Sequence, residues 1–195
     1  MSDTIIDLIR HGEPQGGSLY RGHSIDDPLS DKGWQQMRYA VGNYNQWEHI
    51  ISSPMLRCKA FSEEIAQKIS IPLDIEENLK EVGFGSWEGF TREQIKQKNI
   101  NEYNDFYSDP VKNRPDSFED LNAFIKRVTT AYSKITRNYE GKNILLVAHA
   151  GVIRAILASI VEAPAKGLYK LKIANAGISR INASTGEIIF INNSL

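Results

Sequence analysis

The chain has 195 residues, with 23 lysines and arginines against 24 aspartates and glutamates, which gives a formal net charge of -1 at pH 7. The length predicts one globular domain, or one with a small inserted lobe. Hydrophobic residues make up 41% of the sequence and charged residues 24%, values typical of a domain with a real core rather than a disordered chain. The balanced charge argues against a nucleic-acid-binding protein, and the single cysteine, Cys58, excludes an intrachain disulfide framework and a cysteine-rich zinc module.

Two segments come nearest to a targeting sequence or a membrane span, and neither fits. Residues 1–9 carry two aspartates and a brief apolar run, so they lack the basic start and apolar core of a signal peptide. The most apolar stretch, 151–161, is interrupted by Arg154 and falls short of the ~20 apolar residues that a membrane-spanning helix needs. We therefore expect a cytoplasmic protein that binds neither membrane nor nucleic acid.

Apolar, β-branched stretches alternate along the chain with stretches of helical periodicity, which is typical of an α/β domain with a largely parallel sheet. In chain order, the predicted elements are a strand at 4–9, a helix at 31–47, a strand at 49–52, a helix at 54–68, a strand at 71–75, one or two short helices within 91–109, a helix at 118–139, a strand at 143–148, a helix at 150–161 and three edge strands at 169–173, 177–181 and 188–192.

Capping residues support four of these helix starts. A serine or threonine before a helix accepts a hydrogen bond from a backbone N–H of the first turn, and proline is favoured at the first helical position. The predicted caps are Ser30, Ser53 followed by Pro54, Thr91 paired with Gln94 in a capping box, and Ser117.

Polar side chains follow three of the predicted strands. One strand ends at Arg10 and His11, another is followed within one helical turn by Arg57, and a third ends at His149. Ligands of open α/β sheets bind outside the carboxyl ends of the strands, where helix N-termini add backbone N–H groups and positive dipole ends. This collection suits a phosphoryl group better than any other common ligand.

The residue types fit phosphoryl transfer for chemical reasons. Guanidinium groups bind phosphate oxygens in pairs and stay protonated, so Arg10 and Arg57 can hold a dianion throughout a reaction. A neutral imidazole is a competent nucleophile toward phosphorus, which makes His11 the candidate for a covalent intermediate. The glycines that follow the two histidines, Gly12 and Gly151, are expected to leave room for phosphate at the backbone.

Four segments resemble, in order, the motif segments of the histidine phosphatase (phosphoglycerate mutase-like) superfamily: LIRHGE at 8–13, SSPMLR at 52–57, LKEVGFGSWEG at 79–89 and LVAHAG at 146–151. The resemblance covers nearly the whole chain. It implies a single domain over 1–195, with a three-layer α/β/α fold, a mostly parallel central sheet and helices on both faces. It also implies that 91–140 is a helical segment on the substrate side, and that no metal or cofactor takes part.

The resemblance implies a role for each matching residue. His11 is expected to carry the phosphohistidine, while Arg10, Arg57 and His149 are expected to bind the phosphate, His149 also as a catalytic group. Glu81 matches the family's proton donor.

Glu81 also makes chemical sense on its own. Expulsion of an alkoxide at neutral pH calls for a general acid, a role typically worth ~10²–10⁴ in rate. Because Val82, Phe84 and Trp87 flank Glu81, we expect its carboxyl group to be partly buried.

The loop after the first strand is expected to border the substrate, which makes Gly22 and His23, together with Gly12, candidate substrate contacts. Taken alone, His23 is an ordinary loop residue. Many family members carry an asparagine a few residues after RHGE that contacts the phosphate, whereas this chain has none there. The amide of Gln15 or a backbone N–H of Gly16 or Gly17 can replace that contact, because a glycine-rich turn can form an anion-binding nest.

The resemblance implies a metal-independent phosphomonoesterase acting on a small phosphate monoester. Segments 20–30 and 81–89 are most similar to the bacterial branch that includes alpha-ribazole 5'-phosphate phosphatases, which act late in cobalamin assembly. A phosphoglycerate mutase is the alternative, although mutases of this family are longer. A catalytically inactive member that binds a phosphorylated ligand is a third hypothesis, disfavoured because the candidate residues are all present. The edge strands near the C-terminus are compatible with a homodimer.

Overall fold

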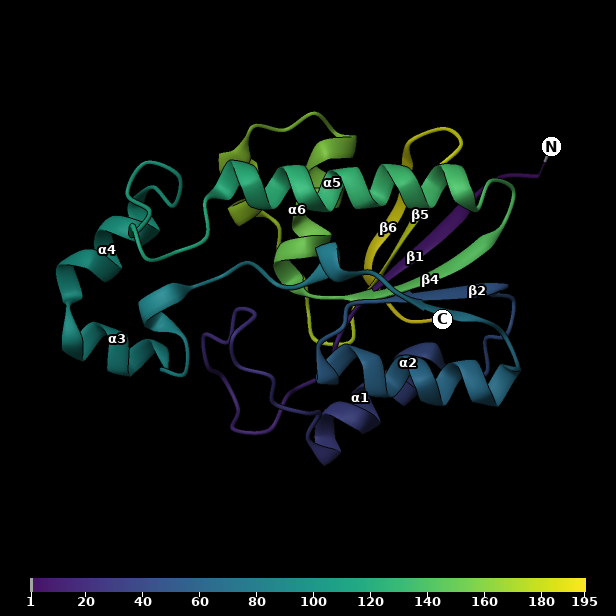
Figure 1. Cartoon of the computed structure of the whole chain (residues 1–195), viewed down its shortest axis with the longest axis horizontal. Helices are drawn as coiled ribbons and strands as arrows, with labels where there is room; N and C mark the ends of the chain where they lie inside the picture. Colours follow the sequence, from purple (N-terminus) through teal and green to yellow (C-terminus); the bar gives the residue numbers. More distant parts are fainter. Residues whose placement is uncertain (1) are drawn as a thin grey trace.

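A six-stranded sheet forms the centre of the protein, and the computed structural model describes residues 2–195 (Figure 1). Met1, part of the segment considered for a signal peptide, lies outside the described residues. The strands are β1 (Ile5–Arg10), β2 (His49–Ser52), β3 (Leu73–Ile75), β4 (Asn143–Ala148), β5 (Ile178–Asn182) and β6 (Glu187–Asn193). Their order is β3-β2-β4-β1-β5-β6, with the first four parallel and β5 and β6 antiparallel at one edge.

Helices cover both faces of this sheet. In Figure 1, α1 (Asp31–Val41) and α2 (Leu56–Ile69) lie below it, and α5 (Leu121–Asn138) and α6 (Ala150–Ile160) lie above it. Strand side chains alternate between two buried cores, as the pleat requires. Leu8, Ile144 and Leu146 pack with α5 and α6, and Ile9, Leu145 and Val147 pack with α1 and α2. The predicted three-layer α/β/α fold with a mostly parallel sheet is confirmed.

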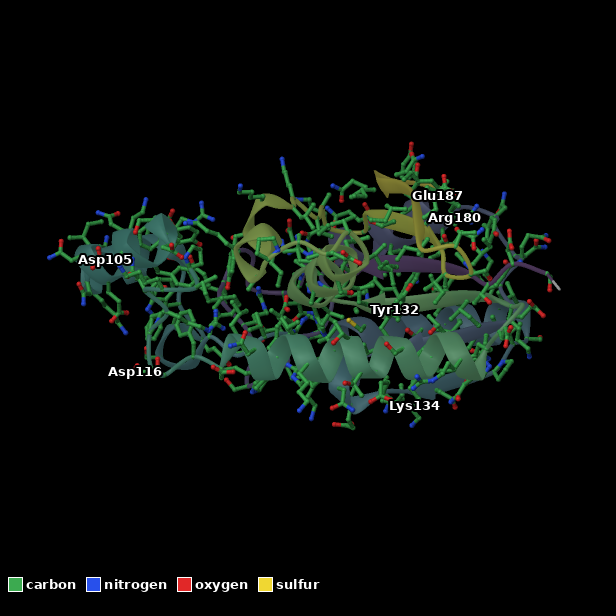
Figure 2. All side chains as sticks on the ribbon, turned by 90° about the horizontal axis from the view of Figure 1, so that it is seen from above. Asp105, Asp116, Tyr132, Lys134, Arg180 and Glu187 are labelled. Atoms are coloured by element: carbon green, nitrogen blue, oxygen red, sulfur yellow. The ribbon has the colours of Figure 1, made fainter. Side chains whose placement is uncertain are left out.

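A small lobe projects from one end of these layers (Figures 1 and 2). It contains α3 (Arg92–Lys98), α4 (Ile100–Ser108) and the short 3-10 helix η2 (Gly85–Trp87). Trp87 is its centre, with an aromatic side chain packed against Tyr103, Phe106 and Phe118. The lobe therefore has a core of its own, whereas α5, later in the expected substrate-side segment 91–140, covers the sheet.

Two other short 3-10 helices complete the chain, η1 (Glu77–Leu79) and η3 (Ala165–Lys170). The strand predicted at 169–173 is wrong, because the second of these helices ends there and an irregular segment follows. That segment has another partner, since the carbonyl oxygen of Ile173 accepts a hydrogen bond from Nη1 of Arg10 at 2.8 Å.

The first helix ends earlier than predicted. It stops at Val41 instead of residue 47, because Gly42 adopts a positive φ of 51° and its N–H returns to the carbonyl oxygen of Arg38. Trp47 then turns into the core, where its Nε1 donates to the buried carboxylate of Asp7 at 2.8 Å.

Two of the four predicted caps are confirmed. The Ser30 hydroxyl accepts from Gly33 N, and Thr91 and Gln94 form the reciprocal capping box. The other two predictions are wrong. Helix α2 begins at Leu56 without a side-chain cap, and α5 begins at Leu121, where the carboxylate of Asp120 caps it by accepting from Ala123 N at 2.7 Å.

The two serines that do not cap a helix, Ser53 and Ser117, make other contacts. Ser117 Oγ lies 2.9 Å from the hydroxyl of Ser86, and Ser53 Oγ lies 2.7 Å from Nε2 of His149. Between residues 2 and 195, no helix is both long enough and apolar enough to cross a membrane.

Candidate active site

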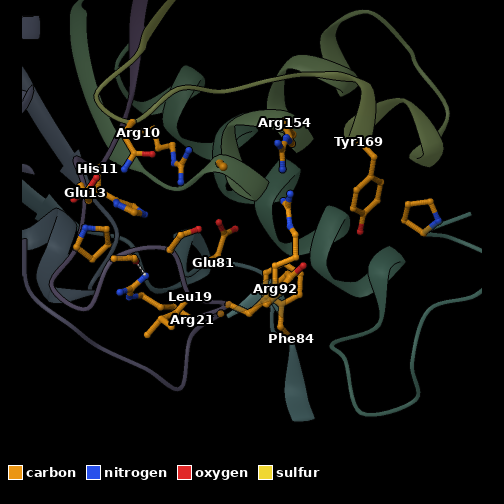
Figure 3. Close-up of a pocket in the computed structure, with 18 of the residues that line it drawn as sticks. Arg10, His11, Glu13, Leu19, Arg21, Glu81, Phe84, Arg92, Arg154 and Tyr169 are labelled. Atoms are coloured by element: carbon orange, nitrogen blue, oxygen red, sulfur yellow. Dashed lines mark hydrogen bonds between the residues drawn. The ribbon is translucent and has the colours of Figure 1, made fainter. Parts of the chain in front are cut away.

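A cavity of about 830 Å³ lies at the carboxyl ends of β1, β2 and β4 (Figure 3). Its walls come from the loop after β1, from the start of α2, from α6 and from the lobe. Seven basic side chains line it against two carboxylates, those of Glu13 and Glu81. Such a surplus of positive charge in a concave site attracts anionic ligands.

His11 follows β1 directly and is 6% exposed. Its Nδ1 lies 2.7 Å from the carbonyl oxygen of Gly12, and because a carbonyl oxygen only accepts, Nδ1 carries the proton of the neutral ring. Burial, followed by the charges of Arg10 and Arg57, lowers the pKa of His11 well below 6.5. The ring is therefore neutral at physiological pH, with the lone pair on Nε2.

Arg10 and Arg57 are held by backbone carbonyl groups. Arg10 donates to Ile173, and Arg57, which is 1% exposed, donates to the carbonyl oxygens of Gly22 and Ile25 at 2.8 and 3.0 Å. The Nε atoms of both arginines are buried and have no hydrogen-bond partner within residues 2–195. Unpaired buried donors on two cationic side chains are expected where an anion binds.

His149 directly follows β4 and lies behind His11, with the two ring centroids 5.2 Å apart in an edge arrangement. It is completely buried, and burial, followed by the charge of Arg57, lowers its pKa well below 6.5. Its Nε2 contacts Ser53 Oγ, and its ring also lies against the thiol of Cys58. His149 is thus part of the site but not among the residues that line the cavity.

Cys58 is completely buried beside the site. Burial raises the pKa of its thiol to about 12, so the thiol stays protonated, and its Sγ lies 3.4 Å from the carbonyl oxygen of Ala148. A protonated, inaccessible thiol is a poor nucleophile.

Glu81 stands on the cavity wall opposite His11 (Figure 3). Its two carboxylate oxygens accept from the backbone N–H groups of Val82 at 2.9 Å and Gly151 at 3.2 Å. A Cβ on Gly151 would overlap the Glu81 carboxylate. Gly151, two residues after His149, therefore makes room for Glu81, whereas the sequence predicts that it leaves room for phosphate.

The glycine after His11 has a different neighbour. A Cβ on Gly12 would overlap the backbone carbonyl of Gly33 in α1, so this glycine allows the loop to lie directly on that helix. The expectation that Gly12 leaves space for phosphate finds no support in this packing. Gly12 is also not among the residues that line the cavity.

The two other candidate substrate contacts lie in different settings. Gly22 lines the cavity, has a positive φ of 52° and packs against the side chain of Glu88. His23 is not among the residues that line the cavity, and its 41% exposed side chain donates through Nδ1 to the carbonyl oxygen of Glu81 at 3.0 Å. His23 thus supports the backbone of Glu81.

Arg21 organises the glycine-rich loop that lacks the asparagine. Its guanidinium donates to the carbonyl oxygens of Gln15 and Gly17 and to the carboxylate of Asp27, and the side chain is 7% exposed. Gly16 and Gly17 have positive φ values of 77° and 71°, which only glycine adopts readily. Of the three replacement candidates named from the sequence, Gly17 lines the cavity, and Arg21 lines it too.

Sequence reasoning missed several residues of this site. Ser53 was assigned to a helix cap, and Arg21, Arg92 and Arg154 were given no role. One signal was present, because Arg154 is the only charged residue in α6, a helix that is otherwise almost entirely buried. Within residues 2–195, the structure holds no group of three or more His, Cys, Asp or Glu side chains arranged to bind a metal ion.

The chain is similar to known proteins over nearly its whole length. The model of the family described as "Histidine phosphatase superfamily (branch 1)" matches residues 6–192. The chain is 25% identical over 183 residues to the adenosylcobalamin/alpha-ribazole phosphatase of Salmonella typhimurium, a match that covers 92% of this chain and 90% of that protein.

Solved structures show the same fold. YhfR of Bacillus stearothermophilus superposes with a TM-score of 0.87 at 24% identity, covering 98% of each chain. A phosphoserine phosphatase of Entamoeba histolytica, in complex with 3-phosphoglyceric acid, superposes with a TM-score of 0.83 at 24% identity, again covering 98% of each chain.

Proposed function

Because the chain belongs to the histidine phosphatase superfamily, we propose that it hydrolyses phosphate monoesters without a metal, through a phosphohistidine formed on His11. The broader class, a phosphoric monoester hydrolase, follows from the family and from its phosphatase relatives.

One observation carries the proposal, the 2.7 Å contact between Nδ1 of His11 and the carbonyl oxygen of Gly12. It fixes the tautomer whose Nε2 has a free lone pair, in a ring that lines the cavity. Arg10 and Arg57, with buried and unpaired Nε atoms, supply positive charge beside that nitrogen. Phosphoryl transfer depends mostly on positioning and charge stabilisation, and this arrangement supplies both.

The reaction has two balanced steps. In the first, Nε2 of His11 forms a bond to phosphorus, the ester P–O bond breaks, and protonated Glu81 gives its proton to the departing oxygen. In the second, the Glu81 carboxylate takes a proton from water, the resulting hydroxide attacks phosphorus, and the N–P bond breaks to release phosphate. The backbone contacts of Glu81 to Val82 and Gly151 support this role, since they hold the carboxylate at the cavity wall.

The test is phosphate release from p-nitrophenyl phosphate in excess EDTA, with wild type, His11→Ala and the matched control His49→Ala, a histidine that begins β2 and contacts Asp74 outside the cavity. We expect wild type and the control to release phosphate and to trap acid-labile phosphate on the protein, and His11→Ala to do neither. Labelled phosphate still trapped on His11→Ala would refute the nucleophile assignment. Activity that EDTA abolishes and zinc restores would refute the metal-free mechanism.

The ester remains to be identified by a substrate panel. The similarity to the adenosylcobalamin/alpha-ribazole phosphatase of Salmonella typhimurium brings alpha-ribazole 5'-phosphate into that panel, with cobalamin assembly as its pathway. Transfer of phosphate to a second oxygen of 3-phosphoglycerate, without release, would favour the mutase alternative. Turnover of any ester at ordinary enzymatic rates would exclude a binding-only protein.

A further inference from the structure

Two arginines line the cavity beyond Glu81, on the side away from His11. Arg92 comes from α3 in the lobe and Arg154 from α6. In Figure 3 both guanidinium groups point into the cavity toward one another. The cavity thus has two cationic ends, one with Arg10 and Arg57 beside His11 and one in this outer part.

Neither outer arginine is neutralised. Among residues 2–195, no carboxylate lies within ion-pair distance of Arg92 or Arg154, whereas surface arginines such as Arg38 and Arg180 each pair with a carboxylate at 2.6 to 2.8 Å. Nε of Arg154 donates to the carbonyl oxygen of Leu171 at 2.7 Å, a bond that orients the guanidinium and leaves both terminal nitrogens to a ligand.

The positive charge of Arg154 also acts on Arg10, at the end of the cavity where phosphate is proposed to bind. Burial lowers the pKa of Arg10, Glu81 opposes this, and the positive charges of Arg154 and Arg57 lower it further. Three of the seven basic side chains that line the cavity, Arg21, Arg57 and Lys166, pair with carboxylates outside its lining, and Glu13 pairs with Lys32. Four basic side chains, those of Arg10, Arg92, Arg154 and Lys170, then face the carboxylate of Glu81 and the two negative charges of a phosphate monoester. A surplus of positive charge therefore remains when the phosphate end is filled, and like charges held together favour a second anion between them.

We infer that Arg92 and Arg154 form a second anion subsite, so that the preferred substrates are phosphate monoesters whose alcohol part carries another oxyanion, a carboxylate or a second phosphate. This inference rests on the proposed phosphatase function. The planar guanidinium donors match the paired oxygens of either group. Because the sugar and base of alpha-ribazole 5'-phosphate carry no anion, that ester is a weaker substrate than one with a second anion.

Matched pairs of esters test the subsite in the wild-type protein. 3-Phosphoglycerate and glycerol 3-phosphate differ by a carboxylate against a hydroxymethyl group, and fructose 1,6-bisphosphate and fructose 6-phosphate differ by a phosphate. We expect kcat/KM at least about 10-fold higher for the anionic member of one or both pairs, as charge-assisted hydrogen bonds provide. The first pair reports a carboxylate and the second a phosphate. Equal kcat/KM values for the two members of both pairs would overturn the inference.

Variants then assign the preference to the two arginines. Arg92 is exposed, and Arg92→Gln is expected to lower kcat/KM for the anionic ester about 10-fold more than for its uncharged partner, mostly through KM. Arg154→Gln should lower kcat/KM for the anionic ester in the same way. Arg154→Lys should lower it less, because lysine keeps the positive charge. Arg38→Gln, on the exposed face of α1, is the matched control and should change neither ester. Equal losses on both members of a pair in Arg92→Gln would show a structural role instead.

Failure of the subsite and failure of the phosphatase have separate readouts. p-Nitrophenyl phosphate carries no second anion, so its hydrolysis tests the phosphatase alone. If no ester is hydrolysed, binding of 3-phosphoglycerate and of glycerol 3-phosphate to wild type and Arg92→Gln by calorimetry still decides the subsite. Equal affinity for the two ligands in wild type would overturn it.

Discussion

The hydroxyl oxygen of Ser53 lies 2.7 Å from Nε2 of His149, and both side chains are completely buried. The two residues are 96 positions apart in the chain and meet where β2 and β4 end side by side. This hydrogen bond sets the plane of the His149 ring, whose edge contacts the ring of His11. A serine outside the proposed catalytic set therefore positions the second histidine.

Replacement of Ser53 by alanine should reduce both stability and activity. It leaves Nε2 of His149 buried with only the weak contact to the Cys58 thiol at 3.7 Å, and an unsatisfied buried group of this kind costs about 1–3 kcal/mol of the free energy of unfolding. We expect kcat to fall more than KM changes, because the ring loses its fixed orientation. Urea unfolding and steady-state kinetics measure the two effects. Ser52→Ala is the control, since that buried hydroxyl donates only to the Ser53 carbonyl oxygen. Comparable losses in both variants would argue against a positioning role for Ser53.

Replacement of Glu81 by glutamine should separate esters by their leaving group. An alkoxide needs a proton as it leaves and a nitrophenolate does not, so we expect about 10²–10⁴-fold loss on alkyl phosphates and a much smaller loss on p-nitrophenyl phosphate. Glu13→Gln removes the other carboxylate of the cavity, which pairs with Lys32 at the surface, and should treat both esters alike. Equal losses on the two esters in Glu81→Gln would contradict the proton-donor role.

Gly151→Ala should lower activity with little change in stability, whereas Gly12→Ala should lower stability. At Gly151 the new methyl group meets the end of the Glu81 side chain, which can swing aside. We expect a loss of activity on alkyl esters with a change in unfolding free energy within about 1 kcal/mol. At Gly12 the methyl group meets the backbone of Gly33, which cannot move cheaply, so destabilisation by about 3 kcal/mol or more is expected. A fully active Gly151→Ala enzyme would show that Glu81 need not stay where the structure has it.

Stability should fall as pH decreases below about 6.5. Burial is the first cause that lowers the pKa of both His11 and His149 well below that value. Above pH 6.5 both rings are neutral in the folded and unfolded states and add no pH dependence. Below it the unfolded chain takes up protons that the folded protein resists, so each histidine lowers the unfolding free energy by up to ~1.4 kcal/mol per pH unit. The dependence of the unfolding free energy on pH, measured by urea unfolding between pH 6.5 and 5.5, should be weaker in His11→Asn. An unchanged dependence would show that His11 does not resist protonation in the folded protein.

Much of the fold and of the candidate site could be predicted from local patterns. β1, β2 and β4 read as strands because runs such as NILLVA are buried on both faces, and Arg10, His11, Arg57 and His149 stand beside their ends. Parallel strands bring their carboxyl ends to one edge, so the convergence of these residues follows from the topology. The helix errors at Ser53 and Ser117 have one cause, since a serine hydroxyl can cap a helix or bond to a distant partner with similar energy.

Contacts between distant segments decided the rest. The sequence contains Ser53, Gly151, Arg92 and Arg154, but no local pattern brings Ser53 to His149, Gly151 to Glu81, or an arginine of the lobe to face one of α6. Side-chain hydrogen bonds and charge depend on which groups lie within a few ångströms, and chain separation does not report that distance. Strand and helix periodicity determined the layers and the place of the site. Tertiary packing alone decided the orientation of the second histidine, the position of the carboxylate and the second cationic end of the cavity.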